Sequence, residues 1–212
     1  MRYILFDDYN SKDFGLLYLN KSIGAPTVKT SYVSIPGGDG SLDYSEFYGG
    51  PKYDNRTLTM NFASIVRSYA DRMNQDSAVK NALHGQRRTV IFDDDPGFYY
   101  VARLTVGDWY NEDGVGYLTV YGTAEPWKYS VHETVVTQSG NGVALLENLR
   151  MPVTPRITAT AAATLTWPGH SVAIETPGSD LIVPSLTLGA GATEVTVETT
   201  GTVTFTYRQG GF

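Results

Sequence analysis

Short segments in which apolar and polar residues alternate occur along most of this 212-residue chain. In residues 57–62, TLTMNF, the side chains of Leu58, Met60 and Phe62 fall on one face of an extended strand, and the residues between them fall on the other. The same alternation, in β-branched and aromatic residues that suit a sheet, occurs in three more segments: residues 88–92, 98–106 and 116–124. This pattern predicts a mainly β protein of the α+β class.

Residues 64–84 have helical periodicity instead. Ser64 can cap the start of a helix, and apolar residues then recur at helical spacing: Ile65, Val66, Tyr69 and Met73. Asp76 is placed as a second cap, and Gly85 supplies a C-terminal stop. We therefore expect one broken helix or two short helices over residues 64–84, packed on a sheet.

The C-terminal part of the chain consists of short strand-like segments spaced by about ten residues, a pattern typical of a β-sandwich. The last of these segments indicates a hairpin with its turn at Gly201. Its apolar side chains alternate on both sides of that turn: Val195, Val197, Val203, Phe205 and Tyr207. The sequence therefore predicts a small β-sandwich that ends in a hairpin.

The composition of the chain changes near residue 139. Residues 1–138 contain 13 Lys and Arg against 17 Asp and Glu, whereas residues 139–212 contain 3 against 5. The second segment has no lysine, 14 threonines and 4 of the 26 aromatic residues. Two domains, 1–138 and 139–212, are the simplest interpretation, with the joint in the polar residues 137–142, TQSGNG.

The overall composition excludes several classes of protein. The chain has no cysteine, so it has no disulfide or thiolate site. A net charge of −6 argues against a protein that grips nucleic acid through phosphate contacts. No apolar run approaches the roughly 20 residues of a membrane helix, and the N-terminus lacks the apolar core of a signal peptide. We expect a soluble protein without a membrane partner that is not exported by the usual signal route.

Glycines and carboxylates are concentrated in residues 37–54. The glycines are Gly37, Gly38, Gly40, Gly49 and Gly50, and the carboxylates are Asp39, Asp43, Glu46 and Asp54. A phosphate-binding loop would need a helix after the glycines and a Walker lysine, and neither follows here. A metal loop and a turn that shapes a protein surface are the remaining interpretations.

No residue pattern nominates a metal, cofactor or catalytic site. In residues 92–97, FDDDPG, Asp93 and Asp95 could share an ion while Asp94 points away, so a solvated turn is the simpler interpretation. His84, His132 and His170 have no second histidine at ligand spacing. We therefore expect a protein that is not an enzyme, has no cofactor and binds no catalytic metal.

Four segments, in this order, resemble the distal tail proteins of siphophages. Residues 33–62 are similar to that family's N-terminal signature, in which a Val-x-x-Pro-Gly strand end leads to Asp-Gly, Leu-Asp, a glycine pair and an alternating strand. Residues 83–103 resemble its Leu-x-Gly, strand, Asp-rich turn and aromatic strand. Residues 121–129, YGTAEPWKY, and 201–212, GTVTFTYRQGGF, resemble its closing strand and the C-terminal hairpin of its galectin-like domain. The resemblance covers nearly the whole chain.

The resemblance implies a structural hub at the tip of a phage tail, in the virion, assembled in the host cytoplasm. Six subunits would form a ring, with an N-terminal domain that builds the ring and a galectin-like C-terminal domain that projects outward. Its partners would be the tail tube protein, a tail-associated tip protein and receptor-binding or fibre proteins. DNA would pass through the lumen without specific binding. The short C-terminal segment departs from longer members that carry extra carbohydrate-binding modules, which argues against direct host binding.

Within such a ring, the glycine-rich region provides the hypothesis for the subunit interface. Its turns would present large side chains to a neighbour, and the proposed interface residues are Gly37, Gly38, Asp39, Gly40, Leu42, Tyr44, Phe47, Tyr48, Gly49 and Gly50. The alternative is that the aromatic residues fold back on their own sheet. A different function, a lectin-like adsorption protein, would use Trp167 as a sugar platform, because it is the only tryptophan of the second segment.

Overall fold

The computed structural model describes residues 2–47, 49–64, 66 and 68–212, and the chain divides into two compact units, Met1–Pro126 and Trp127–Phe212. The division therefore falls earlier than the predicted joint at residues 137–142. That polar, glycine-containing stretch is instead the connection between two strands of the second unit. Turn residues mark any sharp change of chain direction, and the turn in residues 137–142 lies within the second unit.

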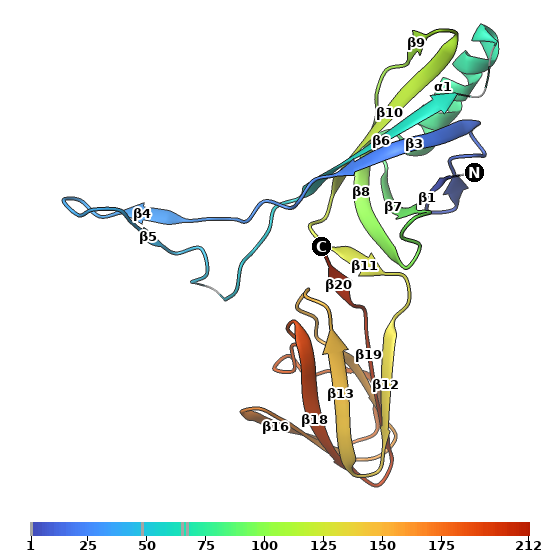
Figure 1. Cartoon of the computed structure of the whole chain (residues 1–212). Helices are drawn as coiled ribbons and strands as arrows, with labels where there is room; N and C mark the ends of the chain where they lie inside the picture. Colours follow the sequence, from blue (N-terminus) through green and yellow to red (C-terminus); the bar gives the residue numbers. More distant parts are fainter. Residues whose placement is uncertain (1, 48, 65, 67) are drawn as a thin grey trace. The chain divides into compact units, whose positions relative to one another are not determined.

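Strands make up most of the first unit (Figure 1). In chain order they are β1 (Ile4–Phe6), β2 (Tyr9–Asn10), β3 (Leu16–Ile23), β4 (Tyr32–Ser34), β5 (Ser41–Asp43), β6 (Arg56–Ser64), β7 (Arg87–Phe92), β8 (Phe98–Val106), β9 (Tyr110–Glu112) and β10 (Val115–Ala124). Seven of them form an antiparallel sheet in the order β2-β1-β7-β8-β10-β6-β3, and β9 pairs with β10 as a hairpin. The prediction of a mainly β fold is confirmed.

The predicted alternation in this sheet is confirmed. Leu58, Met60 and Phe62 of β6 are fully buried, and they share a core with alternate residues of the neighbouring strands. The longest register joins β10 to β6, from Gly116 opposite Ser64 to Ala124 opposite Arg56. Burying one face of each strand in this way fixes the register, since a slip by one residue would turn the apolar face to water.

Helix α1 (Tyr69–Leu83) is the one α-helix in the described part of the chain. It begins five residues later than predicted, because Ser64 is the last residue of β6 and its hydroxyl donates to Oε1 of Gln75 at 2.7 Å. Val79 and Leu83 pack into the core of the sheet, and Gly85, the predicted stop, follows the helix with a φ of +74°. Ile65, part of the predicted periodicity, lies outside the described residues.

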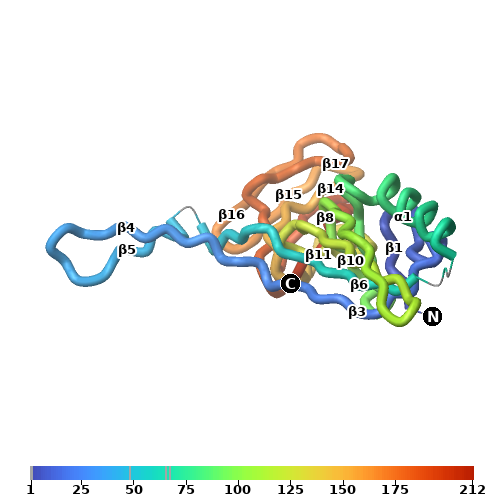
Figure 2. Tube along the Cα trace, turned by 90° about the horizontal axis from the view of Figure 1, so that it is seen from above, coloured from blue at the N-terminus to red at the C-terminus, as the bar shows by residue number. Residues whose placement is uncertain are grey.

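Between β3 and β6 the chain leaves the sheet as a long two-stranded extension, residues 24–55, which we call the arm (Figures 1 and 2). Arg56 is 7% exposed and holds its root, where the guanidinium Nε donates to the carbonyl oxygen of Gly24 at 2.8 Å. Farther out, Val28 pairs with Tyr53 as an antiparallel bridge, and the ribbon formed by β4 and β5 follows. The arm therefore continues the two strands that flank it.

The second unit is a β-sandwich, as predicted, with a short ribbon beside it. Its strands are β11 (Lys128–Ser130), β12 (Thr134–Ser139), β13 (Gly142–Asn148), β14 (Arg156–Ala159), β15 (Ala163–Trp167), β16 (His170–Ile174), β17 (Gly178–Ile182), β18 (Gly191–Thr199), β19 (Thr202–Tyr207) and β20 (Gly210–Gly211). The two sheets have the orders β12-β19-β14-β17 and β13-β18-β15-β16, and β11 pairs with β20.

The predicted C-terminal hairpin is wrong in one respect. Gly201 does lie in the connection between β18 and β19, but these strands belong to different sheets of the sandwich. Val195 and Val197 of one sheet and Phe205 of the other are fully buried in the shared core. Alternation on both sides of a turn is therefore produced here by two strands that face each other across a core, not by two paired strands.

Candidate interaction site on the arm

The arm differs from the rest of the first unit because its large apolar side chains are exposed. Every residue of β4 and β5 is exposed, and Phe47 and Tyr32 have 67% and 62% of their surface accessible. The exposed large apolar residues of the described arm are Val28, Tyr32, Val33, Ile35, Leu42, Tyr44 and Phe47. The alternative in which these aromatics fold back on their own sheet is not what the structure shows.

The glycines set the turns of the arm. β4 and β5 pair from Tyr32 opposite Asp43 to Ser34 opposite Ser41, and the loop between them contains Gly37 and Gly40 with φ of +77° and +76°. Gly49 has a φ of +104°, whereas Gly38 and Gly50 lie outside the left-handed region. Three of the five glycines of this segment therefore have the positive φ that favours glycine.

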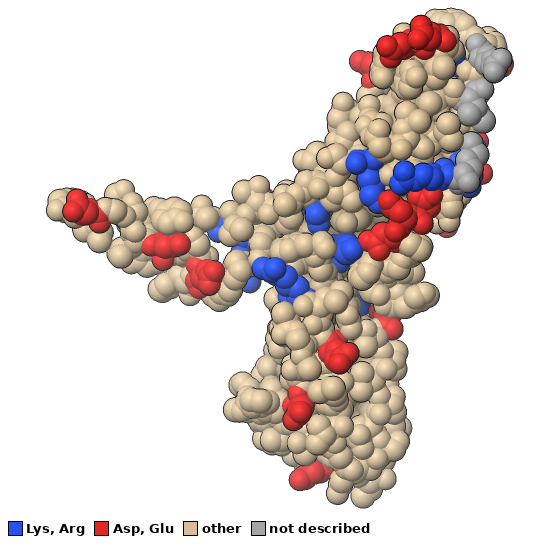
Figure 3. All heavy atoms as spheres, viewed as in Figure 1, with Lys and Arg blue, Asp and Glu red and all other residues tan. Residues whose placement is uncertain are grey.

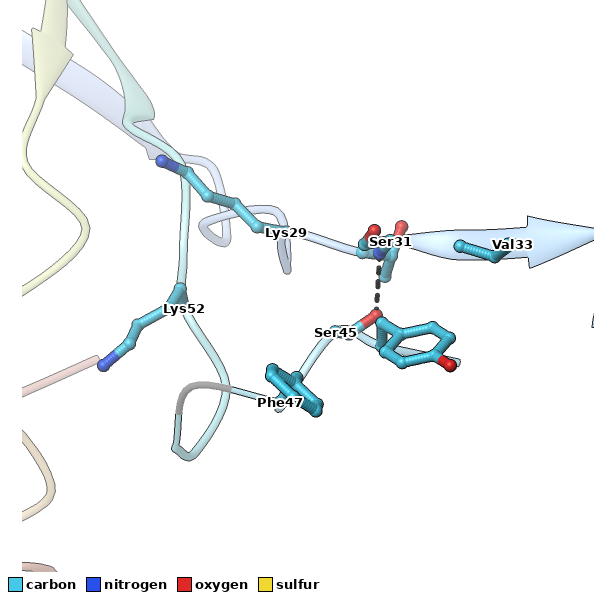
Figure 4. A pocket seen from close by; sticks show the side chains of 8 residues that line it. Lys29, Ser31, Val33, Ser45, Phe47 and Lys52 are labelled. Carbon is cyan, nitrogen blue, oxygen red and sulfur yellow. Dashed lines mark hydrogen bonds between the residues drawn. The ribbon is translucent and has the colours of Figure 1, made fainter. Parts of the chain in front are cut away.

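A second turn follows β5 and is held by side-chain hydrogen bonds. The carboxylate of Asp43 accepts a hydrogen bond from the amide of Ser45 at 2.8 Å, and the hydroxyl of Ser45 accepts one from the amide of Ser31 at 2.9 Å (Figure 4). The hydrogen bonds from Ser45 lower the pKa of the Asp43 carboxyl below its ordinary value. The rings of Tyr44 and Phe47 lie 5.8 Å apart in this turn, so the two aromatics form one apolar surface.

These segments enclose a groove of about 610 Å³, which we call the arm groove. Its lining residues are Lys29, Thr30, Ser31, Val33, Tyr44, Ser45, Phe47 and Lys52 (Figure 4). Val33, Tyr44 and Phe47 supply an apolar wall, and Lys29 and Lys52 line the groove on the side of Figure 4 away from Val33. The groove thus combines apolar surface with two ammonium groups.

The predicted interface residues include part of this groove. Leu42, Tyr44 and Phe47 are exposed on the arm as expected, and Asp39 lies in the loop beyond β4, while Tyr48 lies outside the described residues. The prediction missed Lys29, Val33 and Lys52, because it considered only the stretch between the first and last glycines. The alternation of Tyr32, Val33 and Ile35 before the first glycine was a usable signal for that missing wall.

The candidate sugar platform is not open to solvent. Trp167 is 8% exposed and belongs to the core of the sandwich, and its ring stacks on His170 with centroids 5.4 Å apart. A single tryptophan on an alternating strand fits a core residue as well as a binding residue. In the structure, its position in β15 places the ring in the core of the sandwich. Trp167 is therefore corrected from a possible sugar contact to a core residue.

The acidic turn before β8 is held by neighbouring cations. Asp94 is paired with Lys21 and with Arg2, and the hydrogen bond from Lys21 lowers the pKa of the Asp94 carboxyl. Asp93 accepts a hydrogen bond from the amide of Tyr3 at 3.1 Å. Over residues 2–47, 49–64, 66 and 68–212, no group of three His, Asp or Glu side chains is arranged to hold a metal ion.

The histidines lie apart from one another in contacts of the fold. His84 follows α1, and its Nδ1 accepts a hydrogen bond from the amide of Val106 at 3.2 Å. The carbonyl oxygen of His132 accepts from the hydroxyl of Ser130 at 2.8 Å, and His170 stacks on Trp167. α1 is also too short and too polar to cross a membrane, and the described chain contains no other helix to consider.

The fold has a close counterpart among solved structures. No protein-family model matches the chain, and no curated protein matches it. One solved structure, described as the Dit (gp 19.1) protein of SPP1, a paradigm of the hub adsorption apparatus in phages that infect Gram-positive bacteria, aligns with a TM-score of 0.69. The alignment covers 98% of this chain and 99% of that chain at 16% identity. The chain therefore has the fold of that hub protein along nearly its whole length.

Proposed function

We propose that this chain is a distal tail protein of a phage with a long flexible tail. It forms a hub, a ring of six copies, that joins the tail tube protein to a tail-associated tip protein and to receptor-binding or fibre proteins. The ring is assembled in the host cytoplasm and becomes part of the virion at the tip of the tail. The likeness to a phage hub protein supports this assignment, because it covers 98% of this chain and 99% of that chain.

The single observation that carries the ring is the exposed apolar surface of the arm. A two-stranded ribbon is marginally stable in water by itself, and seven large apolar residues on it are exposed. Monomeric proteins rarely leave a contiguous apolar patch of this kind uncovered. In a ring the arm of each copy would pack on the next copy, in a head-to-tail contact that repeats until the ring closes.

Charge is compatible with a conduit for DNA. Six copies of a chain of net charge −6 carry −36, which repels phosphate rather than binding it. A ring with this charge lets DNA pass without holding it. The second unit contacts adsorption proteins in this proposal. Sugar binding through Trp167 is not favoured, because that tryptophan is buried in the core of the sandwich.

The ring is tested by removing the apolar surface of the arm. The double variant Tyr44→Ser, Phe47→Ser loses two aromatic side chains, each of which contributes about 1.5–3 kcal/mol when buried. We expect assembly to weaken by at least about 100-fold, since 1.4 kcal/mol corresponds to about a factor of ten. Light scattering after size exclusion gives the mass, and averaged electron micrographs of the wild type give the symmetry.

A matched control changes exposed apolar residues elsewhere in the same unit. Tyr69→Ser, Met73→Ser acts on the exposed face of α1 and should assemble like the wild type. A wild-type protein that stays monomeric at every concentration would refute the ring. Full assembly of the Tyr44→Ser, Phe47→Ser variant would refute the role of the arm.

A further inference from the structure

The arm groove carries two lysines on neighbouring segments of the arm. Lys29 and Lys52 lie on paired segments of the arm, and the amide of Lys29 donates to the carbonyl oxygen of Lys52 at 2.8 Å. Like charges directly opposite each other across a ribbon are destabilising. Asp54 lies 3.4 Å from the amine of Lys29 and lies outside the groove lining, so the lining itself carries two cations and no carboxylate. Carboxylates of another chain would complement the two lysines.

The hairpin of β9 and β10 carries a complementary surface at its tip. Glu112 and Asp113 are exposed there, and no Lys, Arg or His of the described chain lies within ion-pair distance of them. Figure 3 shows acidic side chains gathered at this end of the first unit. Tyr110, 55% exposed, lies beside them, so the tip presents an aromatic ring next to unpaired carboxylates.

This tip is held in one conformation. Arg72 of α1 donates to the side chain of Asn111 and to the carbonyl oxygen of Gly114, the latter at 2.6 Å. Asp113 and Gly114 both have positive φ, +49° and +78°, as a tight two-residue hairpin turn requires. A rigid tip loses little conformational entropy when it docks, which favours its use as a contact element.

We propose that the arm groove of one copy receives the β9–β10 tip of the next copy. Glu112 and Asp113 meet Lys29 and Lys52, and Tyr110 packs against the apolar wall of the groove. The inference rests on the proposed ring and goes beyond it, because it names the surface of the neighbour on which the arm packs. The two surfaces are different patches of the same chain, which is the arrangement that a head-to-tail ring needs.

Charge exchange tests this pairing. Lys29→Glu, Lys52→Glu makes the groove anionic, and Glu112→Lys, Asp113→Asn makes the tip cationic, with Asn chosen at position 113 because it tolerates the positive φ there better than Lys. In each variant alone, the groove and the tip carry charges of the same sign and repel each other. We therefore expect each variant to assemble at least about 100-fold more weakly than the wild type. Unchanged thermal unfolding of each variant shows that the fold is intact.

An equimolar mixture of the two variants should restore assembly. An anionic groove then meets a cationic tip, a cationic groove meets an anionic tip, and the copies alternate around a ring with an even number of subunits. Native mass spectrometry measures the composition, and we expect equal numbers of the two variants. Glu194→Lys, Glu198→Lys reverses two exposed charges on β18 of the second unit and should leave assembly unchanged.

The outcomes separate this pairing from the ring itself. If the wild type assembles and the mixture does not recover, the groove and the tip are not partners, and the ring stands without this contact. If either variant alone assembles as tightly as the wild type, the pairing is also overturned. A wild type that never assembles overturns both the pairing and the ring.

Discussion

The sheet of the first unit and its arm are built from similar residues but use them in opposite ways. β6 buries Leu58, Met60 and Phe62 completely, whereas β4 and β5 bury no residue. Both regions are antiparallel, and both contain aromatic and β-branched side chains. The difference shows that the residue types of a strand do not determine whether an apolar side chain stabilises its own chain or a contact with another chain. In the sheet these side chains stabilise the unit, and in the arm they are available to a partner.

The two regions also differ in how much pairing holds them. β6 pairs with β10 along its whole length and with β3 on its other side, while β4 pairs with β5 over three residue positions. Three or more strands with an apolar face are needed for independent stability. Substitutions in the sheet should therefore change the free energy of unfolding, and substitutions in the arm should change assembly.

The largest expected effect is on the sheet. Phe62 is fully buried, with Phe6 and Tyr18 at ring distances of 6.5 and 6.1 Å. Phe62→Ala should lower the free energy of unfolding by about 3–5 kcal/mol, because it removes a large side chain and leaves a cavity. Urea denaturation measures this, and the arm variant Tyr44→Ser, Phe47→Ser serves as the contrast, with a change below about 0.5 kcal/mol. Equal losses in both variants would show that the comparison between sheet and arm is wrong.

A smaller effect is expected at the edge of the sheet, where Asp7 has a φ of +50° and accepts hydrogen bonds from the amide and hydroxyl of Thr89 at 2.8 and 2.6 Å. Burial alone would raise the pKa of the Asp7 carboxyl, but hydrogen bonds from Thr89 and Arg88 outweigh it, so the pKa lies below its ordinary value of 3.8. A lowered pKa gives stability that is present above pH 3.8 and is lost as the pH falls through the folded pKa.

Asp7→Asn tests this contribution without changing the shape of the side chain. Its free energy of unfolding at neutral pH should be lower than that of the wild type by about 1–2 kcal/mol. The difference should shrink at acidic pH, where the wild-type carboxyl is also protonated. A gap that stays constant from pH 7 to pH 3 would exclude the charge of Asp7 as its cause.

The smallest expected effect lies in the turn of the arm. Gly40 has a φ of +76°, and no atom lies within 4 Å of the position that a Cβ would occupy, so Gly40→Ala adds backbone strain of about 1–2 kcal/mol and no clash. Because the turn is outside the core, the melting temperature should not move, and assembly should weaken by about tenfold. Gly50→Ala is the matched control, because Gly50 has equal space and lacks a positive φ. Equal effects of the two variants would mean that φ is not the cause.

Much of the core could be predicted from alternation. Leu58, Met60 and Phe62 of β6, and Val195, Val197 and Phe205 of the sandwich, follow from period two alone, since a half-buried strand needs that spacing. The arrangement of β18 and β19 could not be predicted in the same way. Strands that pair and strands that face each other across a core produce the same alternation, and tertiary packing decides between them.

The boundary between the two units was less predictable, because turns within a unit and joints between units have similar compositions. Residues 137–142 and the turn at Gly201 have the same polar and glycine-containing composition, and both connect the two sheets of the second unit. The actual division after Pro126 has no comparable change in composition. For the candidate site, the glycine turns indicated an unusual loop, but Lys29 and Lys52 are brought together only by the pairing of the arm, which no local pattern encodes.

The exposed edges of the arm also bear on solubility. An uncovered ribbon with apolar side chains is a template for indiscriminate strand addition, which leads to aggregates rather than rings. Asp39, Asp43 and Glu46 interrupt the apolar residues of the distal arm, so an added strand would meet their charges at each attempt. We expect these carboxylates to limit such strand addition before subunits assemble. Their neutralisation would therefore convert orderly assembly into precipitation, even where every contact of the finished ring is retained.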